Sequence, residues 1–427
     1  MKVLIVGGGG REHAIALKIK ENPEVTALYA APGNGGIAQI ATCLPFKATD
    51  VDGIVRWAAE NKVDFVIVAP DDPLCLGMVD ALAAQGILAF GPRKNAAIIE
   101  GSKVFSKNLM KKYGIPTAAY ETFDDYDAAV KYLQTADMPI VVKADGLALG
   151  KGVLICPDRE SAVEAVASMM KEAKFGASGA RVVIEEFLTG PEVSVLAFTD
   201  GKTVKPMVSS MDHKRALDHD EGLNTGGMGT IAPNPCYTPE LAQRCMDEIF
   251  LPTIAAMNAE GRTFTGCLYF GLMMTPKGPK VIEYNCRFGD PETQVVLPLL
   301  KSDLLTIMRA TVDGTLADTP VEFASGAACC VVLASGGYPV SYKSGYPISG
   351  LDEAGKTATV FHAGTKLIDG QIVTAGGRVL GVTATANTLE AAIDKAYQAA
   401  DKITFTDMHM RRDIGQRALA SRKENHS

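Results

Sequence analysis

Short apolar runs alternate with a helical pattern in the first hundred residues. The apolar runs cover residues 3–6, 27–30 and 64–68, and residues 14–19 have the spacing of a helix. Strands that alternate with helices predict a parallel, doubly wound sheet. Ligands of such sheets bind at the carboxyl ends of the strands. Those ends carry glycine-rich or acidic loops at residues 7–10, 32–36 and 70–73.

The remainder of the chain contains further β-like and helical runs. The expected strands are residues 139–143, 150–155, 182–187, 327–333 and 377–382, and the expected helices are residues 161–173 and 389–400. The stretch between residues 192 and 310 is longer and mixed, with polar loops of the kind that often carry function. We find no internal repeat and no low-complexity segment.

Residues 280–288 form the most informative run. A strand period of two places Glu283, Asn285 and Arg287 on one face. The alternate positions form an apolar face: Ile282, Tyr284, Cys286 and Phe288. Carboxylate and amide oxygens suit Mg²⁺, which also takes phosphate oxygens, and a neighbouring arginine suits an anionic intermediate. A half-exposed strand with a solvated polar face gives the same pattern, but it does not explain the carboxylates that follow at Asp290 and Glu292.

Four consecutive glycines at 7–10 suggest a dinucleotide-binding turn, but the spacing does not fit. The G-x-G-x-x-G fingerprint needs a glycine where Glu12 or His13 stands, and no acidic residue closes the second strand. NAD and FAD are therefore disfavoured. The glycines still suit a phosphate at the start of the following helix, and a tight turn without a ligand is the alternative.

Two other glycine-rich stretches leave two interpretations each. Residues 146–152 fail the P-loop pattern, because three residues separate Gly146 from Gly150 and Gly152 replaces the Ser or Thr. A hairpin that covers ATP phosphates and a plain β-turn fit this stretch equally well. The polar stretches 212–215 and 224–229 fit a solvated surface loop or a loop that binds substrate and phosphate.

Composition narrows the class of protein. The 427 residues carry a formal net charge of −7, which argues weakly against nucleic-acid or anionic-membrane partners. No apolar run approaches the roughly 20 residues that span a bilayer, and the short apolar start reads as a strand, not a signal peptide. Nine cysteines without a C-x-x-C pair indicate reduced thiols in a cytoplasmic protein. Histidines without H-x-x-x-H spacing make a zinc site improbable.

Taken together, the motifs resemble the ATP-grasp superfamily and, within it, the phosphoribosylamine–glycine ligase family. The ATP-grasp features are residues 101–103, 143–146, 150–152, 185–188 and 283–285. The signatures of the narrower family are residues 8–14, 31–34, 212–215, 224–229, 285–294, 361–365 and 376–379. The resemblance covers nearly the whole chain. It departs at Asp71, where the family usually has Glu in a Gly-Pro-Glu run, at Gly8 in place of Asn, and at Leu223 in place of Pro.

This resemblance implies an α/β architecture of three parts. An N-terminal doubly wound domain for substrate is expected over residues 1–102, and ATP-grasp lobes of α+β type over 103–325, with a mobile lobe at about 120–190. A small β-rich domain is expected over 326–427. The resemblance further implies a cytoplasmic enzyme, a monomer or homodimer, with small-molecule partners and neither nucleic acid nor membrane.

The implied reaction joins glycine to 5-phosphoribosylamine through glycyl phosphate, with ATP and Mg²⁺ (or Mn²⁺), as a step of de novo purine biosynthesis. The implied metal ligands are Glu283 and Asn285, and the implied catalytic residues are Arg287, Asp290, Asp212 and Lys214. The implied ATP-binding residues are Lys103, Lys143, Gly150, Lys151, Gly152, Glu185, Glu186, Phe187, Leu188 and Glu192. The implied substrate-binding residues are Gly8, Gly9, Gly10, Arg11, Glu12, Asn34, Asp71, Asn224, Thr225, Gly226, Arg287 and Thr293.

Three other functions compete with this one. A different ATP-grasp ligase, such as a carboxylase of the biotin or aminoimidazole ribonucleotide type, would use bicarbonate as the acid. A nucleotide sensor on the same fold would lack turnover, and the intact face of Glu283, Asn285 and Arg287 argues against it. A dinucleotide-dependent dehydrogenase is disfavoured by the failed glycine spacing.

Overall fold

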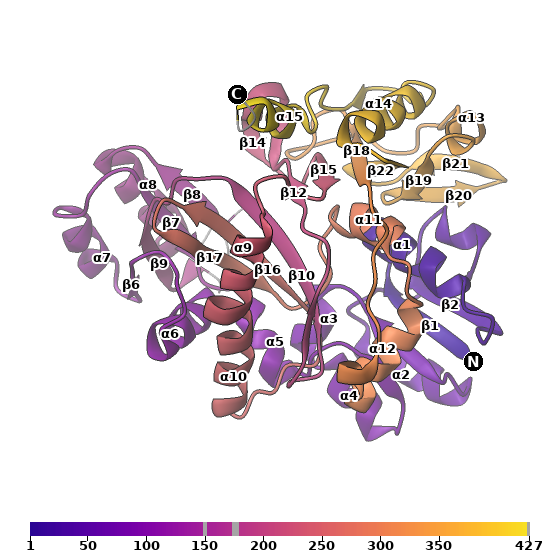
Figure 1. The fold of residues 1–427 in the computed structure, drawn as a ribbon, viewed down its shortest axis with the longest axis horizontal. Helices are drawn as coiled ribbons and strands as arrows, with labels where there is room; N and C mark the ends of the chain where they lie inside the picture. The colour runs from indigo at the N-terminus through magenta and orange to yellow at the C-terminus, as the bar shows by residue number, and fades with distance from the viewer. Residues whose placement is uncertain (148–151, 173–178, 425–427) are drawn as a thin grey trace.

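The N-terminal part is a five-stranded parallel sheet of order β3-β2-β1-β4-β5. The computed structural model describes residues 1–147, 152–172 and 179–424 (Figure 1). The strands of this sheet are β1 Lys2–Gly7, β2 Ala27–Pro32, β3 Thr42–Cys43, β4 Phe65–Val68 and β5 Leu88–Phe90. All neighbouring strands pair in parallel, so the predicted doubly wound sheet is confirmed.

Helices cover both faces of this sheet, which explains why its central strands are apolar on both sides. Val3 and Ile5 of β1 pack with α1 (Gly10–Lys20) and α12 (Leu304–Asp313). Leu4 and Val6 pack instead with α2 (Val51–Glu60) and α4 (Met78–Ala84). At the carboxyl ends of the strands, β4 leads into α3 (Asp71–Leu76) and β5 leads into α5 (Lys94–Gly101).

Two further sheets form the middle of the molecule. The smaller, of order β6-β9-β7-β8, contains β6 Tyr120–Phe123, β7 Ile140–Ala144, β8 Val153–Cys156 and β9 Val182–Glu186, with α7 Tyr126–Leu133 and α8 Arg159–Met170. It has a hydrophobic cluster of its own and lies at the opposite end of the long axis from the N-terminal sheet (Figure 1). The larger, of order β11-β10-β16-β17, contains β10 Glu192–Thr199, β11 Val204–Pro206, β16 Gly266–Thr275 and β17 Gly278–Asn285.

The C-terminal sheet recruits strands from the middle of the chain. Its order is β12-β15-β18-β22-β19, and β23 (Met408–His409) also pairs with β18. The strands β18 Ala327–Ser335, β19 Thr359–His362 and β22 Arg378–Ala386 belong to the C-terminal part, as does α14 Leu389–Ala400. Strands β12 Met211–Asp212 and β15 Gly229–Ala232 come from far earlier and add to the same sheet. Residues 211–232 are thereby tied to the C-terminal part, above the N-terminal sheet in Figure 1.

The remaining elements are short or connect these sheets. The helices are α6 Lys103–Tyr113, α9 Pro239–Cys245, α10 Leu251–Ala259, α11 Thr293–Val296, α13 Leu351–Gly355 and α15 Gln416–Glu424, with the single-turn helices η1 Ile37–Gln39, η3 Asp218–Asp220, η4 Met246–Phe250, η5 Leu297–Leu299 and η6 Leu316–Asp318. The described residues also form two hairpins: β13 Arg215–Leu217 with β14 Glu221–Asn224, and β20 Thr365–Ile368 with β21 Gln371–Thr374. None of the helices in the described ranges is long and apolar enough to cross a bilayer.

The strand expected over residues 280–288 needs a correction. β17 ends at Asn285, and its pairing with β16 shifts register so that Gly271 faces Glu283 while Leu272 faces Val281. Ile282 is the extra residue of this bulge and is only half-buried, so it does not share the apolar face as predicted. From Glu283 to Phe288 the alternation of polar and buried positions holds, although residues 286–288 lie beyond the strand.

A buried contact between α1 and β19 joins the first and last parts of the chain. The His362 N–H donates to Nδ1 of His13 at 2.8 Å, and the two imidazole rings meet edge to face. Asn34 lies beside them, because its amide nitrogen donates to the carbonyls of His362 and Gly8 at 2.8 and 3.0 Å. The Asn34 side-chain oxygen accepts from the backbone of residues 36 and 37. Asn34 therefore holds the glycine turn against the C-terminal part.

We expect this joint to make the fold acid-sensitive. Burial, and for His13 also the neighbouring His362, lowers the pKa of His13 to about 3, and burial lowers the pKa of His362 to about 4. An unfolded histidine has a pKa of about 6.5, so the unfolded chain binds more protons between pH 6.5 and about 4. The contribution of the two neutral histidines to the free energy of unfolding is fully present above pH 6.5. It should fall as the pH drops through that window, by up to about 1.4 kcal/mol per pH unit for each histidine.

Urea unfolding of wild type and His13→Gln at pH 7.5, 6.0 and 5.0 measures this dependence. Glutamine offers an oxygen to the His362 N–H but takes up no proton. The variant should lose stability less steeply below pH 6.5, and an unchanged slope would contradict the assignment.

Candidate active site

Two lysines pair with a buried carboxylate where the two middle sheets meet, and a third lysine lies near them. The Glu185 carboxylate of β9 forms ion pairs with Lys143 of β7 and, at 2.5 Å, with Lys107 of α6. Lys143 Nζ also donates to the Ile282 carbonyl at 3.1 Å, and Lys103 Nζ donates to the Gly146 carbonyl at 2.8 Å. The structure therefore brings together Lys103, Lys143 and Glu185, which the family resemblance marks as ATP-binding.

Lys107 was not among the predicted residues. It follows Lys103 by four positions on α6, so both lie on one helical face, and that spacing was the available signal. Burial lowers the pKa of Lys107 to about 8, although Glu185 opposes the shift. Burial would raise the pKa of Glu185, but Lys143 and Lys107 outweigh it and hold that pKa below its usual value.

The Glu283 carboxylate lies among lysines from three segments of the chain: Lys103 of α6, Lys143 of β7 and Lys214. Lys214 Nζ is 3.1 Å from a Glu192 oxygen and 3.7 Å from Oε1 of Glu283. Although burial favours the neutral acid, Lys214, Lys143 and Lys103 hold the pKa of Glu283 below its usual value, so its carboxylate stays ionised. Together with Asn285, it offers oxygen ligands of the type that Mg²⁺ prefers. Within the described residues no cluster of three His, Cys, Asp or Glu side chains could hold a metal alone.

A second buried carboxylate, Glu100, organises the end of β17. Its oxygens accept hydrogen bonds from the Asn285 amide at 3.0 Å and the Cys286 N–H at 2.7 Å, and it pairs with Arg287 at 3.0 Å. Because the Asn285 nitrogen binds Glu100, the Asn285 oxygen is the atom left to ligate a cation. Burial raises the pKa of Glu100 even though Arg287 opposes that shift. The sequence does not mark Glu100, which sits in the plain helical pattern of α5.

Arg287 has capacity for a further anion. Its Nε is buried and has no hydrogen-bond partner among the described residues, and such an atom usually indicates a missing ligand or water. Asp71, at the carboxyl end of β4, is close enough for its charge to act on both Arg287 and Glu100. Asp71, one of the three positions where the chain departs from the family pattern, thus lies near Arg287 and Glu100.

The glycine turn packs directly on the loop after β17. The Arg11 N–H donates to Oδ2 of Asp290 at 3.4 Å, and the Arg11 guanidinium donates to the Phe288 carbonyl at 3.0 Å and pairs with Glu12. A Cβ on Gly9 would lie 3.2 Å from that Asp290 oxygen, and one on Gly8 would collide with the Gly33 carbonyl. The turn must therefore be glycine to approach these groups.

Asp290 is held as a charged group. Gln294 donates to Oδ1 of Asp290 at 2.7 Å, and Arg378 Nη2 lies 3.6 Å from the same oxygen. Burial opposes ionisation, but Arg378 and Arg11 outweigh it and hold the pKa of Asp290 below its usual value. Arg378, on β22, belongs to a family signature but was not assigned a role from the sequence.

The pKa values of Asp212 and Glu292 are shifted upward, in the direction opposite to that of Asp290. Burial and the neighbouring Glu292 charge raise the pKa of Asp212 well above its usual value, and burial also raises the pKa of Glu292. The pair therefore takes up a proton more readily than isolated carboxyl groups. Thr293 follows Glu292, is fully buried, and donates its hydroxyl to the Gly289 carbonyl, which fixes the turn.

The other residues predicted from the sequence lie in and just after the hairpin of β13 and β14, at the end of β9 and in the glycine-rich stretch before β8. Thr225 donates its N–H and its hydroxyl to the Lys214 carbonyl, Arg378 donates to the Gly226 carbonyl at 2.6 Å, and Asn224 pairs with Arg215 in the hairpin. Residues 186–188 lie at the end of β9 and just beyond it, where Glu186 pairs with Lys280 at 2.6 Å and Phe187 is exposed. Gly152 accepts from the Ala144 N–H, whereas Gly150 and Lys151 lie outside the described residues.

Comparison with known proteins identifies the family. Successive segments match the three models of phosphoribosylglycinamide synthetase: its N domain over residues 1–100, its ATP-grasp (A) domain over 101–293 and its C domain over 328–417. A phosphoribosylamine–glycine ligase of Halalkalibacterium halodurans is 49% identical over 422 residues, which is 99% of this chain and 98% of the relative. The chain belongs to the phosphoribosylglycinamide synthetase family. The family predicted from the sequence is confirmed, and with it an ATP-dependent ligase.

Solved structures agree with this family assignment. The phosphoribosylamine–glycine ligase of Thermotoga maritima is 35% identical, superposes with a TM-score of 0.86, and the match covers 97% of this chain and all of that one. A biotin carboxylase domain from Hydrogenobacter thermophilus, solved with MgADP and bicarbonate, is 18% identical with a TM-score of 0.72, over 96% of this chain and 91% of that one. That second likeness shows a shared fold and no more.

Removal of the Glu100 charge tests whether this carboxylate positions Asn285 and Arg287. Glu100→Gln keeps the shape but leaves Arg287 buried without its counter-charge. A loss of about 2 kcal/mol of positioning energy corresponds to a fall in kcat/KM of roughly 30-fold. Glu353→Gln, in an exposed pair with Lys356, changes the same charge far from the site and should leave kcat/KM unaltered. Wild-type kinetics in Glu100→Gln would remove Glu100 from the account.

Proposed function

We propose that the protein activates the carboxylate of glycine with ATP and transfers the glycyl group to the amine of 5-phosphoribosylamine. The products are glycinamide ribonucleotide, ADP and phosphate. The observation that carries the proposal is the family match along nearly the whole chain. The cations that converge on Glu283 support it, because phosphoryl transfer needs mainly positioning and charge neutralisation.

An acyl phosphate is the chemically reasonable intermediate. A free carboxylate resists attack by an amine, whereas phosphate is a good leaving group. In the first step a glycine oxygen bonds to the γ-phosphorus as the bond to ADP breaks. In the second step the amine nitrogen bonds to the carbonyl carbon, the bond to phosphate breaks, and the nitrogen loses a proton.

The lysine-rich side of the site suits the nucleotide. In this proposal Lys103 and Lys143 bind the phosphates, and residues 186–188, at the exposed end of β9, bind the adenine. The proposal assigns the ribose hydroxyls to Glu192, whose half-exposed carboxylate lies beside Lys214. Mg²⁺ or Mn²⁺ held by Glu283 and Asn285 would neutralise phosphate charge. These two residues fit such an ion because Glu283 stays ionised and Asn285 has its oxygen free of Glu100.

The acidic side of the site suits the amines. Asp290 stays ionised between Arg11 and Arg378 and can orient an amino group. Asp212 and Glu292 have raised pKa values and are suited to accept the proton that the attacking nitrogen loses. In this proposal Arg287 binds the anionic acyl phosphate, and its buried Nε without a hydrogen-bond partner among the described residues supports that role. The glycine turn before α1 and the carboxylate of Asp71 are then left for phosphoribosylamine, whose phosphate suits a helix N-terminus.

ADP release tests the proposal. The purified protein is given ATP and Mg²⁺, and glycine and phosphoribosylamine, made in situ from ribose 5-phosphate and ammonia, are added separately and together. We expect sustained release only when both are present, with glycinamide ribonucleotide detected by mass. Silence with both substrates, together with turnover on bicarbonate or another acid, would keep the ligase chemistry and overturn these substrates.

A further inference from the structure

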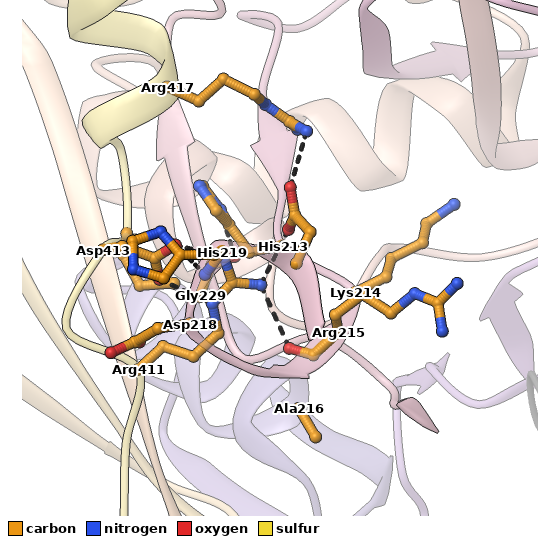
Figure 2. A network of polar contacts seen from close by, with 12 residues as sticks. His213, Lys214, Arg215, Ala216, Asp218, His219, Gly229, Arg411, Asp413 and Arg417 are labelled. Carbon is orange, nitrogen blue, oxygen red and sulfur yellow. Dashed lines mark hydrogen bonds and ion pairs between the residues drawn. The ribbon is translucent and has the colours of Figure 1, made fainter. Parts of the chain in front are cut away.

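Residues 213–220 contact two different parts of the molecule. The Lys214 side chain reaches Glu192 and Glu283 in the active site. The backbone around Lys214 instead contacts residues 409–417, which run from the end of β23 into the start of α15. Figure 2 shows the side chains of Lys214 and Arg215 extending away from the cluster of Arg411, Asp413 and Asp218. A C-terminal segment thus holds the chain from which an active-site lysine projects.

Arg411 is the centre of this contact. Its side chain is only 1% exposed, and its guanidinium binds Asp413 with two hydrogen bonds of 2.8 Å. The remaining Nη1 donates to Oδ1 of Asp220 at 3.0 Å and to the Arg215 carbonyl at 3.2 Å. Arg417 binds the other oxygen of Asp220 at 2.9 Å. The planar guanidinium therefore ties residue 215 to residue 413 with a fixed geometry, which a lysine could not reproduce.

The backbone on both sides of Lys214 is fixed by further contacts. Gly415 donates its N–H to Nε2 of His213 at 3.1 Å, so the ring proton lies on Nδ1 and is donated to the Gly229 carbonyl. His409 Nε2 bonds the Ala216 carbonyl at 2.7 Å. Thr225, which directly follows β14, donates to the Lys214 carbonyl. Each residue from 213 to 216 is therefore held by a partner outside its own strand.

The tip of the hairpin needs this support. His219 and Asp220 have φ values of 60° and 56°, in the left-handed region that side chains other than glycine rarely adopt. Such residues persist where the surrounding structure imposes them. Here Asp413 accepts from the His219 N–H at 2.9 Å, and Asp218 accepts from the Arg412 N–H at 2.7 Å. The C-terminal segment thus supplies the hydrogen bonds that fix an otherwise unfavourable conformation.

We propose that Arg411 is a positioning residue that fixes residues 213–216 and thereby holds Lys214 between Glu192 and Glu283. The inference rests on the proposed function, in which Lys214 belongs to the active site. Without the guanidinium, the Arg215 carbonyl and two carboxylates lose a shared donor, and the hairpin can shift. Lys214 would then sample positions away from Glu283, although every group in the active site is still present.

A double-mutant cycle tests the inference on the full chain. The variants are Arg411→Gln, Lys214→Gln and the double variant, with Arg412→Gln as the matched control. Arg412 is adjacent, and its side chain pairs with Asp401 on the surface, both side chains being more than half exposed. We expect Arg411→Gln to lower kcat about tenfold in wild type and less than about twofold in the Lys214→Gln background, because coupled residues are non-additive. Arg412→Gln should leave kcat unchanged.

Thermal melting of each variant shows whether it is folded at the assay temperature. If Arg411→Gln is not folded at that temperature, Arg411→Lys takes its place in the cycle. Equal losses in both backgrounds, or no loss in the single variant, would overturn the positioning role. Full activity in Lys214→Gln would also overturn it, and would trace the failure to the proposed part of Lys214 in the site. A purely structural role predicts additive losses that follow the melting temperature.

Discussion

The rest of the site depends on the hydrogen bonds and the ion pair that the buried Glu100 carboxylate forms. It accepts hydrogen bonds from Asn285 and Cys286 and pairs with Arg287, so it joins α5 of the N-terminal part to the end of β17. A buried carboxylate is costly unless it is paired and hydrogen-bonded, and here each of its partners lies in one run of three residues. That requirement fixes where β17 ends. It thereby directs Glu283 and Asn285 toward the lysines, and Arg287 toward Asp71.

From this anchor the charges separate into two sides. Lysines of α6 and β7, with Lys214 immediately before β13, form a cationic side around Glu185 and Glu283, which suits the phosphates of a nucleotide. Asp290, Asp212 and Glu292 form an acidic side near the glycine turn, and we propose that this side orients the amines and accepts a proton. Arg287 lies at the junction, and an acyl phosphate formed there would need to move little between the two steps.

Local patterns predicted much of this arrangement, and contacts distant in sequence explain the rest. The period of two from Glu283 to Arg287 placed three functional groups on one face, and the apolar runs located most strands and the helix over residues 389–400. The bulge at Ile282 could not be predicted, since it depends on pairing with β16. Glu100 lacks any local signal because its role arises when α5 meets β17. The pairing of β15 with β18 likewise joins residues about a hundred positions apart.

Transfer of oxygen from glycine to phosphate tests the central claim most directly. Glycine labelled with ¹⁸O in both carboxylate oxygens is converted in the presence of ATP, Mg²⁺ and phosphoribosylamine, and the released phosphate is analysed by mass. If the carboxylate attacks the γ-phosphorus, each phosphate carries one ¹⁸O and the amide of glycinamide ribonucleotide keeps the other. Unlabelled phosphate with normal product formation would contradict the acyl phosphate route and the division of roles built on it.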